Sequence, residues 1–231
     1  MKTFRSKRGP FAERPYLEES EIERTCMTEL IALDLLPKEP RPVRIDRYVE
    51  KRFGVTIQYD DLGSGVLGYT QFGKSGVKAV VVSRALDEEG TVVANRRVRS
   101  TLAHEAGHGI FHAHLFIETG ANSLFPEGIG EKPRVLCRDE EQGGTGGYKG
   151  NWWEWQANRA IGGLLLPKGL VAKAVEQFVE PVGLLGLTVL PTSHRELAVQ
   201  HVAEVFDVNQ VVARRRLEEM FCQGADGQPC L

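Results

Sequence analysis

The sequence predicts an α+β fold in which a small antiparallel sheet precedes a long helix and a C-terminal helical segment follows. Residues 55–83 contain short β-branched or aromatic runs separated by glycine-rich turns, a pattern typical of strands. Residues 95–116 carry apolar side chains at helical spacing. Residues 194–220 read as helix, turn and helix. Sheet and helices therefore occupy separate stretches of the chain, which is characteristic of α+β folds.

The first part of the chain is predicted to be helical. Residues 1–42 carry many charges and several prolines around one helix near 18–36, and we interpret them as an N-terminal extension packed on the main domain. Residues 44–53 are predicted to form an amphipathic helix that ends at Gly54. Its apolar positions are at helical spacing: Ile45, Tyr48, Val49 and Phe53.

Three strands are expected next, at Val55–Tyr59, Val66–Tyr69 and Val77–Ser83. Turns rich in glycine, at 63–65 and 73–76, separate them, so we expect an antiparallel meander.

The second half of the chain is predicted to consist of helices around a glycine-rich connection. A long helix covers 95–116, and residues 119–150 form a glycine-rich loop of a length that is usually functional or disordered. A second helix covers 152–166 and ends at Pro167. The C-terminal helices meet at a turn, residues 207–209, where Asn209 is a suitable N-cap.

Composition excludes several classes of function. The 231 residues carry a formal net charge of −2, which gives no overall attraction to nucleic acid or to an anionic membrane. The N-terminus has basic residues without a following apolar run, and no segment approaches the length of a membrane span. The cysteines are scattered, as expected for free thiols in a reducing compartment: Cys26, Cys137, Cys222 and Cys230. We therefore expect a cytoplasmic protein.

The segment His104-Glu105-Ala106-Gly107-His108 carries the clearest chemical signal. On a helix, His104 and His108 lie one turn apart on the same face, so their imidazoles can bind one tetrahedral metal ion. Glu105 lies at the flank of this pair, where its carboxylate can act as a base toward a water molecule at the open coordination position. The pattern predicts a catalytic zinc site.

Two residues compete for the place of third ligand. His114 follows His108 by six residues, as in the pattern HExxHxxGxxH, but Phe111 stands where that pattern has the glycine that turns the chain toward the metal. Glu154, on the second helix, would approach the histidines from across a groove and complete a set of two histidines and one glutamate.

The chain resembles the ImmA/IrrE family of metallopeptidases. The resemblance covers about residues 44–220 and is carried by Leu102–His108, by Glu154–Arg159 and by the run Leu164-Leu165-Leu166-Pro167. In that family an HExxH helix is followed by an E-x-x-A-N helix. The resemblance implies Zn²⁺ as cofactor, Glu154 as third ligand and a zincin-like catalytic domain over 43–185, between the extension at 1–42 and a helical subdomain at 186–231.

The family also implies a function. Its known members are intracellular, and they cleave repressors of the helix-turn-helix type and so switch on stress-response or mobile-element genes. We therefore expect a zinc endopeptidase with a helix-turn-helix repressor as its protein substrate. The alternative is a non-proteolytic toxin or a DNA-binding regulator of a toxin–antitoxin-like pair. Glu218 and Glu219, close after the arginines at 214–216, argue against direct DNA binding.

Other side chains are expected near the site. His112, one turn beyond His108, is expected to be buried beside the ligands and to orient them rather than to bind metal. Cys137, Tyr148 and His194 are candidates for lining the groove, and Tyr148 or His194 could donate a hydrogen bond to an oxyanion. Their spacing does not select between them.

Overall fold

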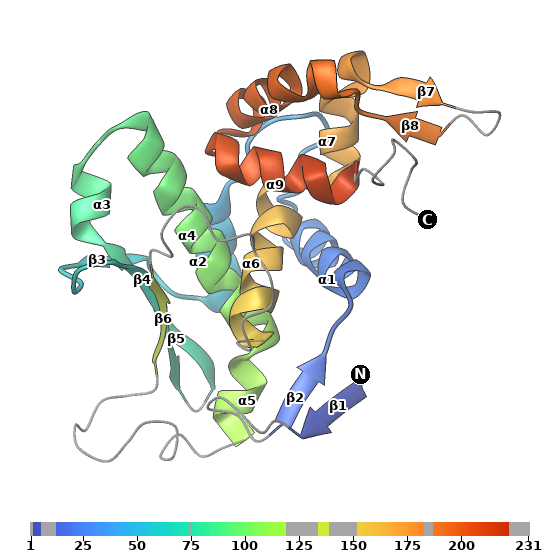
Figure 1. Cartoon of the computed structure of the whole chain (residues 1–231). Coiled ribbons are helices and arrows are strands. Elements are labelled where there is room, and N and C mark those ends of the chain that lie inside the picture. The colour runs from blue at the N-terminus through green and yellow to red at the C-terminus, as the bar shows by residue number, and fades with distance from the viewer. Residues whose placement is uncertain are drawn as a thin grey trace.

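The structure is a computed structural model that describes residues 2–5, 13–73, 75–118, 134–138, 152–182 and 187–221. The described part of the chain is a mixed α and β structure, as the sequence predicts. A small sheet lies on one side of a long central helix, and further helices lie on its other side (Figure 1).

The sheet has four described strands in the order β3-β5-β4-β6: β3 (Gln58–Asp60), β4 (Val66–Gly73), β5 (Gly76–Ser83) and β6 (Arg134–Arg138). β4 pairs antiparallel with β5 and with β6, but β3 pairs parallel with β5. The predicted antiparallel meander is therefore wrong for β3, because β4 does not pair with β3 and the chain returns as β5 between them. β6 also falls within residues 119–150, which were predicted to be loop.

The β4–β5 hairpin presents different side chains on its two faces. Val80 and Val82 on β5 belong to the main core, whereas Val81, between them, packs with Tyr69 in a separate cluster. This alternation follows from the period of two in a strand. Gly76 closes the hairpin with φ of 119°, a conformation that glycine adopts without steric cost.

Helix α4 (Val92–Phe111) runs across the face of this sheet. At its start, the Thr91 hydroxyl accepts a hydrogen bond from the amide of Ala94, a typical N-cap contact. The helix ends at Phe111, its C-cap residue His112 has φ of −120°, and a separate short helix, α5 (Ala113–Glu118), follows. The single helix predicted over 95–116 is wrong at both ends: it starts earlier and breaks at His112.

Helix α6 (Trp152–Leu165) packs against α4 on the side away from the sheet (Figure 1). The two backbones approach closely at Gly107. A Cβ atom at this position would lie 2.8 Å from the Cβ of Ala160 and 3.0 Å from the Cα of Ala157. Small residues on both helices thus set the short distance between them, and the helix predicted at 152–166 is confirmed.

Helix α1 (Glu19–Ala32) packs against the other side of α6, where Gly163 accommodates the side chain of Cys26. Helix α2 (Ile45–Phe53) ends at Gly54 with φ of 66°, as predicted from the glycine. The remaining elements of the first hundred residues are the antiparallel pair β1 (Lys2–Arg5) and β2 (Glu13–Tyr16) and the short helix α3 (Arg84–Glu88).

The C-terminal part consists mainly of helices and lies at the top of Figure 1. Its described elements are α7 (Lys168–Ala174), a 3-10 turn (Glu176–Phe178), the antiparallel pair β7 (Glu180–Val182) and β8 (Leu187–Val189), α8 (Thr192–Phe206) and α9 (Gln210–Met220). Asp207 adopts φ of 52° between α8 and α9, and this confirms the predicted helix, turn and helix. The side chain of Asn209 donates to the carbonyl oxygen of Val93 rather than capping α9.

One hydrophobic cluster joins these parts. It includes Ile22 and Leu30 of α1, Leu102 of α4, Leu164 of α6 and Leu217 of α9, each of them buried. Buried side chains from the predicted extension, the central segment and the C-terminal segment therefore share one core. In the described residues, no helix combines the length and the apolar character that crossing a membrane requires.

Candidate metal centre

Two buried histidines of α4 form the base of the site. His104 and His108 are separated by one helical turn, and only 4% and 0% of their surfaces are exposed. Their Nε2 atoms lie 3.0 Å apart, so both rings direct the same nitrogen toward one point. Two polar ring nitrogens that face each other at this distance add nothing to apolar packing. This geometry is typical of ligands that share a metal ion.

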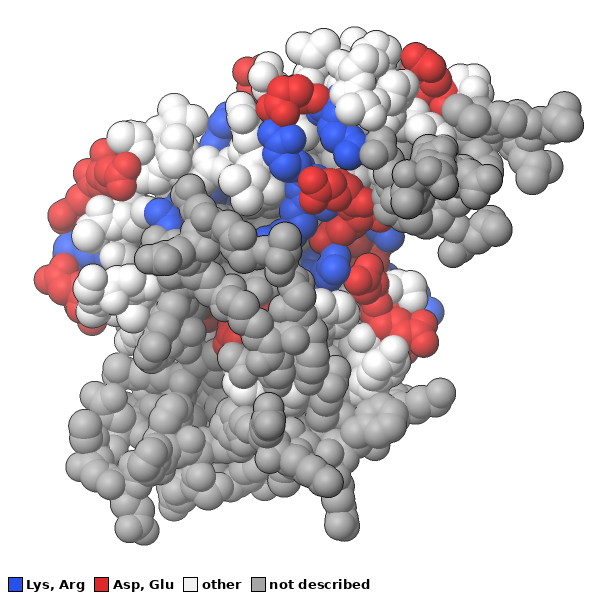
Figure 2. Space-filling model, viewed as in Figure 1, with Lys and Arg blue, Asp and Glu red and all other residues white. Residues whose placement is uncertain are grey.

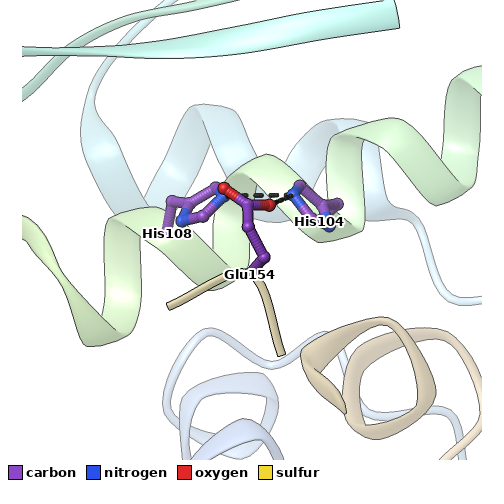
Figure 3. Close-up of side chains that lie close together, drawn as sticks. All are labelled: His104, His108 and Glu154. Atoms are coloured by element: carbon purple, nitrogen blue, oxygen red, sulfur yellow. Dashed lines mark hydrogen bonds and ion pairs between the residues drawn. The ribbon is translucent and has the colours of Figure 1, made fainter. Parts of the chain in front are cut away.

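Glu154 completes the group from the first turn of α6. Its Oε2 lies 3.1 Å from Nε2 of His104 and 3.5 Å from Nε2 of His108, and Figure 3 shows its carboxylate between the two rings. In a tetrahedral site with bonds of 2.0–2.1 Å, ligand atoms lie about 3.3 Å from one another. The three atoms therefore have the separations that a bound ion requires, and this cluster could hold a metal ion.

Each histidine is held through its other ring nitrogen. Nδ1 of His104 lies 3.1 Å from Oδ1 of Asn158. Nδ1 of His108 lies 3.0 Å from Nδ1 of His112, whose Nε2 lies 3.0 Å from Oε1 of Gln156. Outer hydrogen bonds of this kind fix the orientation of a metal-binding imidazole and so raise affinity.

The charges of the site favour a bound cation. Burial acts to raise the pKa of Glu154, but electrostatic interactions with His108 and His104 outweigh burial and hold this pKa well below its usual range. Burial acts to lower the pKa of His104, yet its contacts with Glu154, Glu105 and Asn158 raise this pKa overall. The site thus favours an ionised carboxyl at Glu154 with positive charge beside it, and a bound cation would supply that charge.

Burial lowers the pKa of His108 and lowers that of His112 well below the ordinary value for histidine. Both rings are therefore neutral at pH values near neutrality. A neutral imidazole is the form that binds metal, so no proton has to be removed from His108 before an ion binds.

Glu105 lies beside the histidines but is not part of the converging group. It is fully buried, and its Oε2 accepts a hydrogen bond of 2.6 Å from the hydroxyl of Thr70 on β4. Its Oε1 has no hydrogen-bond partner within the described part of the chain. Burial raises the pKa of Glu105 to about 7. A carboxylate with one oxygen anchored and the other free, and with a pKa near neutrality, suits a general base.

The other predicted residues do not join the cluster, or lie outside the described residues. His114 is on α5 and is not among the converging ligands. His194 is at the start of α8, where its Nδ1 lies 3.1 Å from the carbonyl oxygen of Phe178. Tyr148 and the side chain of Cys137 lie outside the described residues. His112 is buried, and its Nδ1 contacts Nδ1 of His108. It is not one of the three residues that converge on the metal position.

The sequence did not single out Thr70, Gln156 or Asn158, although the last two lie within the motif Glu154–Arg159. Thr70 is one of several polar residues in a strand, and nothing in its neighbours marks it. Gly68 gives an indirect signal. A Cβ atom there would lie 2.7 Å from Cγ2 of Thr101 on α4, so a glycine in this strand marks the place where sheet and helix meet.

Comparison with protein-family models and with curated proteins gave no match to this chain. The assignment of function therefore depends on the sequence motifs and on the geometry of the site.

Proposed function

We propose that the chain is a zinc-dependent endopeptidase with a zincin-like catalytic domain. The observation that carries the proposal is the convergence of three ligand atoms, from His104, His108 and Glu154, beside a buried glutamate. Two histidines and one glutamate, with a fourth position left to water or substrate, are a ligand set of catalytic zinc sites. Structural zinc sites instead use four protein ligands, commonly with cysteine.

The chemistry of the residues fits peptide hydrolysis. A bound zinc ion would polarise the carbonyl of a peptide bond and make a water molecule acidic enough to lose a proton near neutral pH. Glu105 would accept that proton at Oε1 and pass it to the leaving amine. Thr70 holds the opposite oxygen and leaves Oε1 available to accept a proton.

The resemblance to ImmA/IrrE metallopeptidases supports a more specific proposal. We infer that the substrate is a helix-turn-helix repressor, that the protein acts in the cytoplasm, and that cleavage derepresses stress or mobile-element genes. The support is the order of the two motifs along the chain together with the position of Glu154, which the resemblance implies as third ligand and which lies beside both histidines.

The sheet bears on how a substrate could bind. An extended peptide can add to the edge of a sheet through main-chain hydrogen bonds. β4, the strand that contacts Glu105 through Thr70, is already paired with β5 on one side and β6 on the other. Among the described strands, an added peptide would therefore pair with β3 or β6, and β6 is the neighbour of β4.

DNA binding by the C-terminal helices receives less support. Arg216 on α9 is only 3% exposed and pairs with Glu23 of α1, and Arg214 pairs with Glu196 of α8. The visible face of this region carries acidic and basic side chains intermixed (Figure 2). A duplex-binding surface requires a continuous basic patch instead.

The proposal is tested with purified protein, zinc and any helix-turn-helix repressor found to be encoded beside the gene. We expect cleavage of the repressor that stops when a chelator removes zinc and resumes when zinc is restored. Glu105→Gln should abolish cleavage but keep one zinc ion per chain, because Glu105 is not a ligand. The matched control is Glu88→Gln, which alters an exposed carboxylate on α3.

Two results would count against the proposal. A protein that binds zinc but leaves the repressor and unfolded model peptides intact would point to a binding role. Cleavage by Glu105→Gln at the wild-type rate would remove the proposed base.

A further inference from the structure

A buried relay of side chains connects His108 to α6. Nδ1 of His108 lies 3.0 Å from Nδ1 of His112, and Nε2 of His112 lies 3.0 Å from Oε1 of Gln156. None of the three residues is more than 2% exposed. The contacts therefore lie within the protein interior, where a hydrogen bond left unmade is costly.

When both rings are neutral, these contacts fit one pattern of protons. An amide oxygen accepts and never donates, so the proton on His112 is on Nε2, facing Gln156. A neutral imidazole has one donor and one acceptor, which makes Nδ1 of His112 the acceptor. The hydrogen between the two rings is then on Nδ1 of His108. Nε2 of His108 is left with a free lone pair that faces His104 and Glu154.

We propose that Gln156, acting through His112, is a positioning residue that holds His108 in the tautomer able to bind metal. The same side-chain oxygen fixes the angle of the His108 ring, because the His112 ring is held at both nitrogens. α6 therefore supplies the ligand Glu154 and also, two residues later, the acceptor that prepares a ligand on α4.

The break in α4 has a place in this arrangement. The helix ends at Phe111, and His112 is the residue after its last turn. A side chain at this position does not have to point in the direction that the helix sets for its own residues. The His112 ring packs edge-on against Trp152, with 5.5 Å between the ring centroids. Trp152 and Gln156 are one turn apart on α6, so α6 contacts the His112 ring both at its edge and at Nε2.

This inference concerns metal affinity and does not depend on peptidase activity. Gln156→Met keeps a similar volume but removes the acceptor. We expect zinc affinity, measured by competition with a chelator, to fall about 10- to 100-fold, which is the usual effect of losing an outer hydrogen bond to a metal ligand. The d–d absorption of the Co²⁺-substituted protein should also change, because the angle of the His108 ring is no longer fixed.

Gln71→Met is the matched control. It makes the same chemical change at another buried glutamine, on β4, whose side chain leaves the strand on the face opposite Thr70. We expect this control to bind zinc with wild-type affinity. Equal zinc affinity in the wild type and Gln156→Met would overturn the proposal, as would an equal loss in both variants.

A measurement on the wild-type protein makes the test independent of whether either variant folds. Long-range nitrogen–proton correlation spectra of histidine rings distinguish the two tautomers. In the protein with and without zinc, we expect His112 to carry its proton on Nε2 and, with zinc bound, His108 to carry its proton on Nδ1. A proton on Nδ1 of His112 would overturn the proposal.

Discussion

The hydroxyl of Thr70 on β4 lies 2.6 Å from Oε2 of Glu105 on α4, and both residues are fully buried. This hydrogen bond is a direct link between the sheet and the helix that carries the histidines. It occupies one carboxylate oxygen of Glu105 and leaves Oε1 without a partner in the described chain. The sheet thus holds the proposed base, although none of the sheet side chains that the structure describes belongs to the metal-binding group.

Thr70→Val should therefore impair catalysis without affecting the metal. Valine keeps the shape of threonine but cannot donate. The hydrogen bond from Thr70 lowers the pKa of Glu105, so its loss should raise that pKa further above about 7. We expect kcat to fall by about tenfold and the acid limb of the pH–rate profile to move to higher pH. Zinc affinity should be unchanged, because Thr70 does not contact a ligand.

The profile is measured on repressor cleavage, with zinc content determined on the same samples. A lower rate with an unshifted acid limb would show that Thr70 does not act through the pKa of Glu105.

Glu105 should also make the stability of the metal-free protein depend on pH. Burial raises its pKa from 4.5 to about 7, so the folded chain holds the proton more tightly than the unfolded chain. The resulting stabilisation is fully present below pH 4.5 and is lost as the pH rises through about 7. Its size is on the order of 3 kcal/mol, at 1.36 kcal/mol per pKa unit.

Glu105→Gln tests this effect, because it removes the titrating carboxyl and changes no other residue. In chelator-treated samples, denaturant unfolding should show the free energy of unfolding of the variant rising relative to wild type between about pH 4.5 and about pH 8. Parallel curves over this range would mean that the Glu105 carboxylate is not buried as described.

The site was largely predictable because its two helices are marked by local patterns. The helical spacing of 95–116 and the stop at Pro167 follow from side-chain size and backbone chemistry over a few residues. Once both helices are given, two histidines on one turn need a ligand from elsewhere. The choice of Glu154 over His114 came from the family resemblance, since spacing left both open.

The strand order was not predictable in the same way. Alternating apolar residues over 55–59 predict a strand, which the structure has at 58–60 as β3, but they do not say whether it pairs with β4 or with β5. Pairing is decided by contacts between residues distant in sequence. The same reason applies to Gln156, whose importance depends on His112, 44 positions earlier in the chain.

The close contact of α4 and α6 should be sensitive to a single methyl group. A Cβ atom at Gly107 would lie 2.8 Å from Cβ of Ala160, so Gly107→Ala forces the helices apart. We expect a loss of stability of about 1–3 kcal/mol, typical of overpacking. Zinc affinity should fall as well, because Glu154 on α6 would move away from the histidines on α4.

Gly169→Ala is the control for helix propensity. Gly169 is on α7, and a Cβ atom there meets no atom within 4 Å. This substitution should be neutral or stabilise the protein by up to about 1 kcal/mol. If Gly107→Ala bound zinc as tightly as Gly169→Ala, the close approach of the two helices would not be what places Glu154.

The pairing of Arg216 should make the C-terminal helices part of the structural core. Its Nε donates to the carbonyl oxygen of Leu166 at 2.8 Å, and its guanidinium also pairs with Glu23 and Glu219. Arg216→Met leaves Glu23, on α1, without its buried partner. We expect a loss of about 3–5 kcal/mol in the free energy of unfolding, the usual cost of removing one member of a buried ion pair.

The neighbouring Arg215 is exposed, so Arg215→Met should change stability by less than about 0.5 kcal/mol. The pair of variants also tests DNA binding, since a duplex would need the exposed arginine and not the buried one. Denaturant unfolding and salt-dependent duplex binding are measured on both. If Arg215→Met abolished a measurable duplex affinity of the wild type, α9 would be a DNA-contacting helix, and the repressor would not be its sole expected partner.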